Sequence, residues 1–311
     1  MDLAPNPAQQ EVLVLLGRAA ADRPSFPATL RSQLRAQLEE VVAPVAGRLG
    51  DDELLVVDKH RLGLVHGCEA RYLAEEQAPF VPSVPVLRGT VVHKAIELSI
   101  NWRTEPVPAE LVDEALAAYE HGDHWTTDFL RTCSEVERAE LRSEAVEGTT
   151  KFLECFPPLK AAWRPVPEAK LRLDLAGGRV SLRGRVDLSL GRSQGTTAGK
   201  VLIDFKTGGF SPHHVEDLRF YALVETVRLG VPPRLLASYY LDGGRLHPEP
   251  VTEALLASSI RRVGDGVERM VSLRAAGVEP TKRAAPPCRW CPILADCGEG
   301  SAFLERADDL A

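Results

Sequence analysis

A strictly alternating segment, GGRVSLRGRVDLSLG at residues 177–191, is the feature that most constrains the fold of this 311-residue chain. From Val180 onward its apolar residues occupy even positions, whereas polar residues such as Asp187 occupy odd positions. Since successive side chains of a strand point to opposite faces, the pattern predicts a strand with one buried face. The segment KVLIDFKTG at 200–208 predicts a second strand, and residues 214–230 predict a helix after it.

Helical segments precede these strands in the chain. Two helices are expected within residues 7–48, a third over residues 59–76, and a fourth that opens at Gly89. Residues 105–165 are rich in glutamate and alanine, and they predict a helical insert within the domain. The helical first half and the strand-rich second half together exclude an all-β fold.

These elements predict an α/β fold in which helices flank a mixed central sheet. We expect residues 1–58 to form a helical N-terminal extension, and residues 59–300 to form one domain that contains the insert. The composition, 44% hydrophobic and 26% charged, is typical of a soluble globular protein. No apolar run approaches the length of a membrane span and the N-terminus has no signal pattern, so we expect a cytoplasmic protein with no membrane partner.

The formal net charge of −7 is not that of a general nucleic-acid binder. It is compatible with a metal-dependent nuclease, because such an enzyme needs an acidic pocket and can confine its basic residues to one groove. The positive charge is mainly arginine, whose planar fork donates two hydrogen bonds to a phosphate at once. The charge therefore leaves nucleic acid open as a substrate.

Asp204 and Lys206 lie two residues apart on the second predicted strand, so their side chains project from the same face. A carboxylate beside an ammonium suits metal-assisted phosphodiester cleavage: the carboxylate holds Mg²⁺ or Mn²⁺, and the lysine orients or helps to deprotonate the attacking water. A single such triplet is more often a solvated strand face, and one arises by chance in a chain of this composition. Glu168-Ala169-Lys170 is interpreted as such a chance match.

Other potential metal ligands surround this pair in the predicted fold. Asp187 lies on the polar face of the preceding strand, and it meets Asp204 at one metal if the two strands pair. His93 lies near the start of a predicted helix, where a neutral imidazole can be a third ligand. Glu97 lies one turn further along the same helical face, and a water could link it to the metal. The alternative for His93 is a structural role, which is more common for a lone helical histidine.

Asp217 and Tyr221 lie four residues apart on the next predicted helix and share one face of it. From this face they could contact the backbone of a substrate, or Asp217 could contact the lysine. The alternative for Tyr221 is a place in the hydrophobic core beside Leu218 and Val224.

Three of the six cysteines are clustered in the tail as Cys288-x2-Cys291-x5-Cys297. Two thiolates three residues apart are a common spacing in metal sites, and four thiolates suit either Zn²⁺ or an iron–sulfur cluster. The alternatives are a zinc site and unrelated buried cysteines. Cys133 and Cys155 are interpreted as ordinary free cysteines.

The ordered segments GTVVHKAIE, GRVDLSL, VLIDFKTG and EDLRFYALV resemble the RecB/AddB-type nuclease domain of the PD-(D/E)XK superfamily. The resemblance covers about residues 59–100 and 165–300. It implies a restriction-endonuclease-like fold, metal ligation by His93, Asp187 and Asp204, and catalysis by Asp187, Asp204 and Lys206. It also implies the Phe205 carbonyl as a further ligand.

The resemblance extends to two substrate-contacting residues and to the cysteines. Tyr221 matches the family's substrate-binding helix, whereas Asp217 stands where the family usually has glutamine. Cys68, in KHRLGLVHGCEARYL, resembles the early cysteine that the iron–sulfur subset of the family adds to a late C-x2-C-x5-C. This subset includes the CRISPR adaptation nucleases. The four cysteines are then expected to hold a [4Fe-4S] cluster that ties the end of the chain to its beginning, as a long-range cross-link does.

The leading functional hypothesis is a Mg²⁺- or Mn²⁺-dependent deoxyribonuclease, an exonuclease or end-processing enzyme that prefers single-stranded DNA. The chain has no Gly-x4-Gly-Lys-Ser/Thr loop, so ATP-driven unwinding would come from a partner helicase. Two alternatives come from other classes: a non-catalytic DNA-binding or scaffold subunit, and a zinc-stabilised hydrolase of another substrate. DNA repair, plasmid or phage biology and CRISPR adaptation are all compatible with the sequence.

Overall fold

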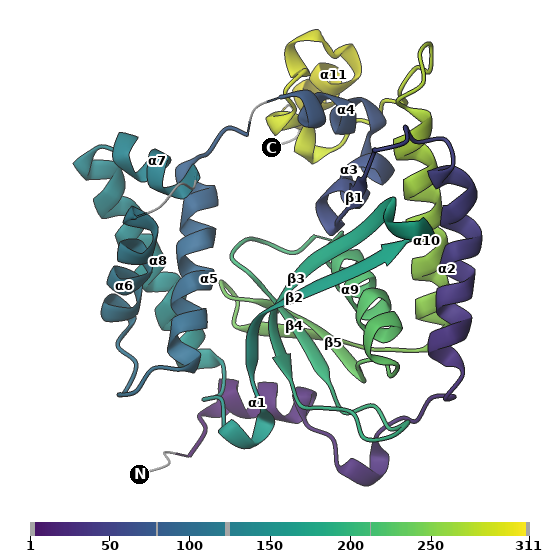
Figure 1. Ribbon diagram of the computed structural model, residues 1–311. Coiled ribbons are helices and arrows are strands. Elements are labelled where there is room, and N and C mark those ends of the chain that lie inside the picture. Colours follow the sequence, from purple (N-terminus) through teal and green to yellow (C-terminus); the bar gives the residue numbers. More distant parts are fainter. Residues whose placement is uncertain (1–3, 79, 122–124, 212, 309–311) are drawn as a thin grey trace. The chain divides into compact units, whose positions relative to one another are not determined.

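The computed structural model describes residues 4–78, 80–121, 125–211 and 213–308 (Figure 1). Its strands are β1 (Leu55–Val57), β2 (Val166–Leu175), β3 (Val180–Leu190), β4 (Val201–Lys206), β5 (Leu235–Tyr240) and β6 (Arg245–Pro250). Its α-helices are α1 (Pro7–Leu16), α2 (Leu30–Ala46), α3 (Lys59–Gly67), α4 (Glu69–Gln77), α5 (Val84–Ile100), α6 (Pro108–Glu120), α7 (Trp125–Thr132), α8 (Glu135–Cys155), α9 (His213–Leu229), α10 (Glu253–Ser272) and α11 (Gly298–Asp308).

The strands form one mixed sheet with the order β1-β3-β4-β5-β6, and β2 pairs with β3 off this path. β4 is antiparallel to β3 and parallel to β5. The parallel pair is connected through α9, because two parallel neighbours need a crossover between them. The predicted α/β class with a mixed central sheet and flanking helices is confirmed.

The chain forms two compact units. Unit 1 consists of Met1–Leu30, Pro82–Leu171 and Arg185–Thr252, and unit 2 consists of Arg31–Val81, Arg172–Gly184 and Glu253–Ala311. The predicted insert supplies α6, α7 and α8 to unit 1. Both units are therefore assembled from segments far apart in the sequence.

The core of unit 1 lies between the sheet and the helices α5 and α8. Phe205 lies between Asp204 and Lys206 in the sequence of β4, and its side chain points into this core. Its ring contacts those of Phe152, Phe156 and Tyr239 at centroid distances of 5.3, 5.6 and 6.0 Å. These pairs are edge-to-face, the arrangement that the ring quadrupole favours. Burial of Phe205 on one face of β4 fixes Asp204 on the other, which positions the site described below.

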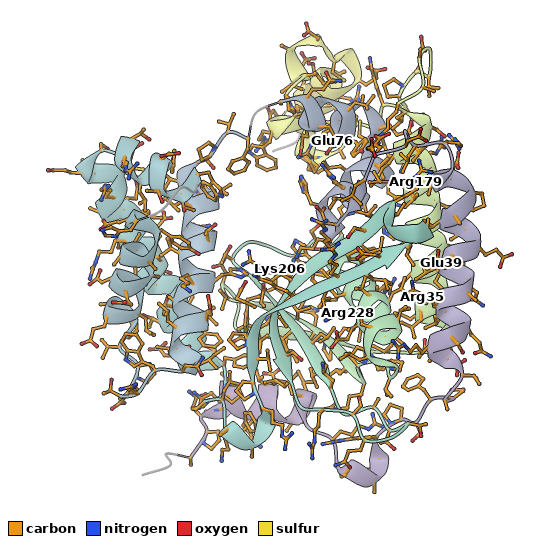
Figure 2. All side chains as sticks on the ribbon, viewed as in Figure 1. Arg35, Glu39, Glu76, Arg179, Lys206 and Arg228 are labelled. Carbon is orange, nitrogen blue, oxygen red and sulfur yellow. The ribbon has the colours of Figure 1, made fainter. Side chains whose placement is uncertain are left out.

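Unit 2 is held together by α2, α3, α4 and α10. Arg35 and Glu39, one turn apart on α2, bind the turn between β2 and β3 (Figure 2): Arg35 donates to the Asp174 carbonyl at 3.1 Å, and Glu39 accepts from the Ala176 N–H at 2.8 Å. On α10, a Cβ at Gly264 would lie 3.1 Å from the Val41 side chain. Glycine here allows α10 to pack closely against α2.

Three expectations about the elements are wrong. The helix expected over 59–76 is two helices, because Cys68 is extended (φ −153°, ψ 111°) between α3 and α4. The helix expected to open at Gly89 begins at Val84, since proline is tolerated in a first turn, where N–H groups have no intrahelical acceptor. β2 was not expected as a strand, and it carries Glu168.

Candidate metal and thiolate sites

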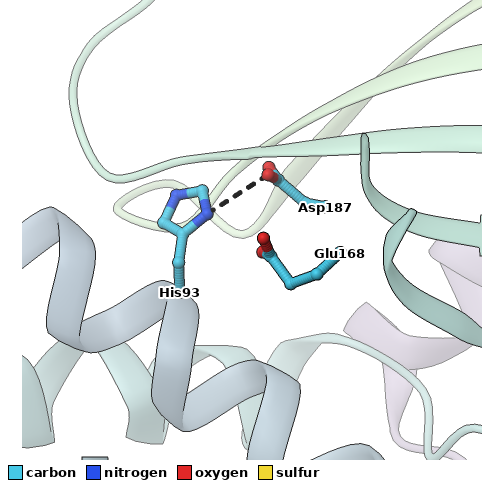
Figure 3. A group of neighbouring side chains, drawn as sticks. All are labelled: His93, Glu168 and Asp187. Atoms are coloured by element: carbon cyan, nitrogen blue, oxygen red, sulfur yellow. Dashed lines mark ion pairs between the residues drawn. The ribbon is translucent and has the colours of Figure 1, made fainter. Parts of the chain in front are cut away.

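Three side chains from three elements of unit 1 converge on one point (Figure 3). His93 comes from α5, Glu168 from β2 and Asp187 from β3. One ligand atom of each lies within 4.8 Å of those of the other two, and His93 Nδ1 is 3.4 Å from Asp187 Oδ1. In the part of the chain that the structure describes, this is the one such group of three or more histidine, cysteine or acidic ligands.

Asp187 is fixed by the pairing of its strand with β4. Its Oδ2 accepts a hydrogen bond from the Phe205 backbone N–H at 2.7 Å, while its Oδ1 faces His93. The antiparallel register that pairs Leu188 with Ile203 brings these groups together. The prediction that Asp187 approaches the Asp204 strand is confirmed.

Asp204 and Lys206 lie on the same face of β4, as predicted (Figure 2 labels Lys206). Asp204 is 1% exposed, and the Lys206 Nζ lies 2.5 Å from its Oδ2. The same Nζ lies 3.2 Å from Oδ2 of Asp217 on α9. Of the two contacts considered for Asp217, the structure shows the one with the lysine. Two carboxylates thus hold one ammonium group.

Electrostatics connects Asp204 to the three-ligand group. Burial alone would lower the pKa of His93, but the nearby carboxylates of Asp187, Asp204 and Glu168 raise it overall. The negative charges of these carboxylates around the imidazole attract a cation. We name the four side chains of His93, Glu168, Asp187 and Asp204 the acidic cluster.

Glu168 is the member of the acidic cluster that the sequence analysis dismissed as part of a chance triplet. Its backbone is in the left-handed region, with φ 51°, and its carboxylate pairs with Arg185 at 2.9 Å. Burial, followed by repulsion from Asp187, raises its pKa, although Arg185 opposes this. A residue with a strained backbone, whose carboxylate lies beside two other potential ligands, is typical of a functional position. The sequence interpretation of Glu168-Ala169-Lys170 as a chance triplet thus did not include this position of Glu168 beside His93 and Asp187.

The donors of the acidic cluster fit a hard divalent cation. Bonds of about 2.0–2.6 Å to Mg²⁺, Mn²⁺ or Ca²⁺ need ligand atoms that lie a few ångströms apart, as those of His93, Glu168 and Asp187 do. Carboxylate oxygens select such ions over soft metals, and a single imidazole does not reverse that selection. The geometry and the donor chemistry agree.

The four cysteines Cys68, Cys288, Cys291 and Cys297, named here the cysteine cluster, all belong to unit 2. The tail reaches Cys68 through Thr281, whose N–H donates to the Glu69 carboxylate at 2.8 Å and whose carbonyl accepts from the Ala70 N–H at 3.2 Å. Burial raises the pKa of Cys291, and the neighbouring Cys68 and Cys288 raise it further. A Cβ at Gly300 would lie 3.5 Å from Cys297 Sγ and 3.6 Å from Cys288 Cβ, which places the last cysteine beside the first of the tail.

The remaining sequence predictions concern Tyr221, the Phe205 carbonyl and Glu97. Tyr221 is 2% exposed, as the alternative core role requires, and its contact with substrate stays a prediction. Ligation by the Phe205 carbonyl also stays a prediction. Glu97 forms an ion pair with Lys94 at 2.9 Å, and its charge raises the pKa of Glu168 slightly, so it lies at the margin of the acidic cluster.

Comparisons with known proteins give a family-model match over most of the chain and matches to solved structures. A family model described as the PD-(D/E)XK nuclease superfamily matches residues 60–298, a range that includes both clusters. Similar solved structures include SSO0001 (13% identity, 86% of this chain and 96% of that one, TM-score 0.36) and a candidate exonuclease from Eubacterium rectale (13% identity, 76% and 88%, TM-score 0.49). No curated protein matches. Among the described residues, no helix has the length and apolar character to cross a bilayer.

Proposed function

The chain belongs to the PD-(D/E)XK nuclease superfamily, and from this premise we propose that it hydrolyses DNA phosphodiester bonds at the acidic cluster. The observation that carries the proposal is the convergence of His93, Glu168 and Asp187 within 4.8 Å, beside the buried Asp204–Lys206 pair. A scaffold that only retained the fold would have no need of this arrangement. Within the chain, residues 59–300 are proposed as the nuclease domain and residues 1–58 as its helical extension. The cytoplasmic location stays a prediction.

Mg²⁺ or Mn²⁺ is the proposed cofactor of the acidic cluster, with His93, Asp187 and Asp204 as its principal ligands and Glu168 as a fourth. When bound, such an ion lowers the pKa of a water molecule and neutralises charge on a phosphate. The protein contributes by fixing its ligands beforehand. The Phe205 N–H holds one oxygen of Asp187 and leaves the other for the cation.

Lys206 is the proposed catalytic lysine. Asp204 and Asp217 flank its Nζ at 2.5 and 3.2 Å, and these two contacts fix the position of the ammonium group. A protonated lysine orients water or a phosphate oxygen by donating hydrogen bonds, and it stabilises negative charge that develops during cleavage. The aspartate that replaces the family's usual glutamine at position 217 thus acts on the lysine.

An exonuclease or end-processing activity with a preference for single-stranded DNA is the proposed reaction. A helicase partner remains part of this proposal, because the chain has no phosphate-binding loop of the ATPase type. The second candidate is a DNA-binding or scaffold subunit. The acidic net charge favours it, and the intact acid and lysine set opposes it.

The cysteine cluster is proposed to hold an iron–sulfur cluster with a structural role. Backbone N–H groups of Arg283 and Ala285 point at the sulfurs of Cys68 and Cys288, each at 3.4 Å, and such bonds stabilise thiolates. Tetrahedral zinc with bonds of about 2.3 Å would hold its thiolates about 3.8 Å apart. Among the described residues, the cysteines form no group of three within 4.8 Å. A zinc site is the alternative.

The experiment that tests the nuclease proposal compares the wild-type chain with Asp204→Ala on labelled DNA, with Mn²⁺ present or chelated. Linear single-stranded, linear double-stranded and circular single-stranded substrates separate the proposed modes. We expect metal-dependent loss of linear single strands by the wild type, little cleavage of circles, and no cleavage by Asp204→Ala. DNA binding, measured by fluorescence anisotropy, is expected to persist in the variant.

The scaffold hypothesis makes the opposite prediction. If purified wild-type protein binds DNA but cleaves none of the three substrates with Mn²⁺ or Mg²⁺, and Asp204→Ala behaves identically, the catalytic proposal is refuted. Rapid cleavage of circles would retain the nuclease and refute the exonuclease.

A further inference from the structure

A pocket of unit 1 is lined by arginines and has a volume of about 440 Å³. No aspartate or glutamate is among its lining residues, all of which belong to the described part of unit 1. We name it the arginine pocket. Its arginines are Arg18, Arg23, Arg164, Arg192 and Arg234. A concentration of five guanidinium groups without a carboxylate is an anion-binding arrangement.

The arginine pocket is separate from the acidic cluster. It lies where β4 begins, at Val201, and α1 lies beside this end of the strands (Figure 1). Lys206 is at the other end of β4, about 16 Å away at the usual rise of a strand. The pocket therefore does not share the space of the catalytic groups.

Two of the arginines have buried nitrogen atoms that lack partners. Within the described structure, the Nε atoms of Arg23 and Arg234 are buried and make no hydrogen bond. The other end of Arg234 is fixed, because its Nη2 donates to the Leu16 carbonyl. A buried donor without an acceptor destabilises the fold, and an anionic oxygen in the pocket would satisfy it.

Like charges are crowded in the arginine pocket. Burial first, and then the positive charges of the neighbouring Arg23 and Arg18, lower the pKa of Arg234 to about 10. Nothing among the lining residues compensates this repulsion. A bound anion would remove it, so the pocket gains stability from a ligand of negative charge.

The backbone around the pocket is shaped for close approach. A Cβ at Gly199 would lie 3.1 Å from Arg23 Nη1 and would clash with the Arg192 carbonyl. Arg164 adopts the left-handed conformation (φ 51°, ψ 59°), which is costly for a side chain other than glycine. The preceding Trp163 is held by its carbonyl, which accepts from the Gly191 N–H at 2.6 Å, and Trp163 also lines the pocket.

We propose that the arginine pocket binds the phosphate group of a nucleotide, with the arginine forks on the phosphate and Trp163 beside the base. The volume is that of a small-ligand pocket, for which about 300–1,000 Å³ is usual. Arginine forks match phosphate oxygens, and an indole offers a face on which any base can stack. Two sources share this chemistry: a free mononucleotide, and the phosphorylated end of a DNA strand.

Isothermal titration of the full chain tests the proposal. The background is Asp204→Ala with divalent ions chelated, so that no probe is degraded. The probes are 5′-dAMP, inorganic phosphate, and one short oligonucleotide with and without a 5′-phosphate. Binding at the pocket is read by Arg23→Gln and by the exposed Arg18→Gln, which keeps the test valid if the first variant does not fold. The matched control is Arg103→Gln, an exposed arginine of unit 1 outside the pocket.

We expect each pocket variant to weaken nucleotide binding about 10- to 100-fold, as the loss of a charged hydrogen bond does, while Arg103→Gln binds normally. Tight binding of 5′-dAMP identifies the free nucleotide as the source. Binding of the 5′-phosphorylated oligonucleotide alone identifies the strand end. No binding by any probe, equal affinity of inorganic phosphate and 5′-dAMP, or equal affinity in pocket and control variants would overturn the proposal. None of these results depends on cleavage.

Discussion

The acidic cluster and the cysteine cluster, the two metal sites proposed for this chain, contrast two ways of bringing potential ligands together. The acidic cluster takes its ligands from α5, β2, β3 and β4, and rigid elements of unit 1 fix each one. The cysteine cluster takes three ligands from the tail, outside long helices and strands, and one from the break between α3 and α4. Rigid elements give the precision that chemistry needs, whereas a tail closed onto an early helix gives stability. We therefore expect changes in the first cluster to affect activity and changes in the second to affect folding.

Of the variants that test this contrast, Lys206→Gln is expected to have the largest effect, a loss of cleavage rate. It removes the ammonium beside Asp204 and Asp217 but no ligand of the acidic cluster. We expect the cleavage rate to fall by about 10²–10⁴-fold. Single-turnover digestion measures the rate, with Lys151→Gln as control because Lys151 pairs only with an exposed Glu147 of α8 among the contacts described for it. Equal rates in the two variants would remove Lys206 from the mechanism.

Cys291→Ser is expected to show the reverse pattern. Cys68 and Cys288 are 220 positions apart, so the cluster closes a long loop, and opening it should lower the free energy of unfolding by about 4 kcal/mol. The visible absorbance of anaerobically purified protein should be lost as well, while molecules that still fold should cleave DNA. Cys133→Ser, outside the cysteine cluster, should change neither property. A colourless wild type that contains zinc would refute the iron–sulfur proposal and leave the stability prediction standing.

Glu168→Gln tests whether the acidic cluster has a fourth member. Loss of one negative ligand should weaken Mn²⁺ affinity at least about 10-fold, with a smaller loss of cleavage at saturating metal. Titration calorimetry measures the affinity, and Lys170→Gln is the control from the same triplet, because Lys170 is exposed. If Mn²⁺ binds the Glu168 variant as tightly as the wild type, the cluster consists of the three ligands that the sequence predicts.

A small effect of pH on stability is expected in unit 2, at His60. The hydrogen bond to Glu75 raises the pKa of His60 above its ordinary 6.5, while partial burial opposes the rise. Such a pair stabilises the fold fully below the unfolded pKa, and the contribution is lost as the pH rises through the higher folded pKa. His60 is 66% exposed, so solvent limits the effect to about 0.5 kcal/mol. Chemical denaturation of the wild type and His60→Gln should show their difference shrinking from pH 5.5 to pH 8.5; a constant difference would exclude the pair as its source.

Sequence patterns predicted the parts of the molecule in which local periodicity and three-dimensional position coincide. The alternation that ends at Leu190 fixed the face of Asp187, and the burial of Phe205 fixed the face of Asp204. Asp217 was correctly expected near the lysine as one of two options. In each case the side-chain period of a strand or helix alone decides the direction.

Other parts depend on tertiary structure that the local pattern does not encode. Glu168 was missed because two features interrupt the alternation of β2: Pro167, and the left-handed backbone of Glu168 itself (φ 51°). The break between α3 and α4 at Cys68 has no proline that would predict it. Just after this break, Glu69 and Ala70 form hydrogen bonds with Thr281, which belongs to the distant tail. The arginine pocket was not predicted, since its five arginines come from segments spread between residues 18 and 234.

The most direct test of the central claim measures metal binding and DNA cleavage on the same samples of wild type and Asp187→Asn. Asp187 contacts both His93 and the Phe205 N–H, so it links the α5 histidine to β4, the strand that carries Asp204. Mn²⁺ binding followed by electron paramagnetic resonance, and digestion of linear single-stranded DNA, should be lost together in the variant while its fold is retained. An Asp187→Asn protein that binds Mn²⁺ and cleaves DNA like the wild type would contradict the account.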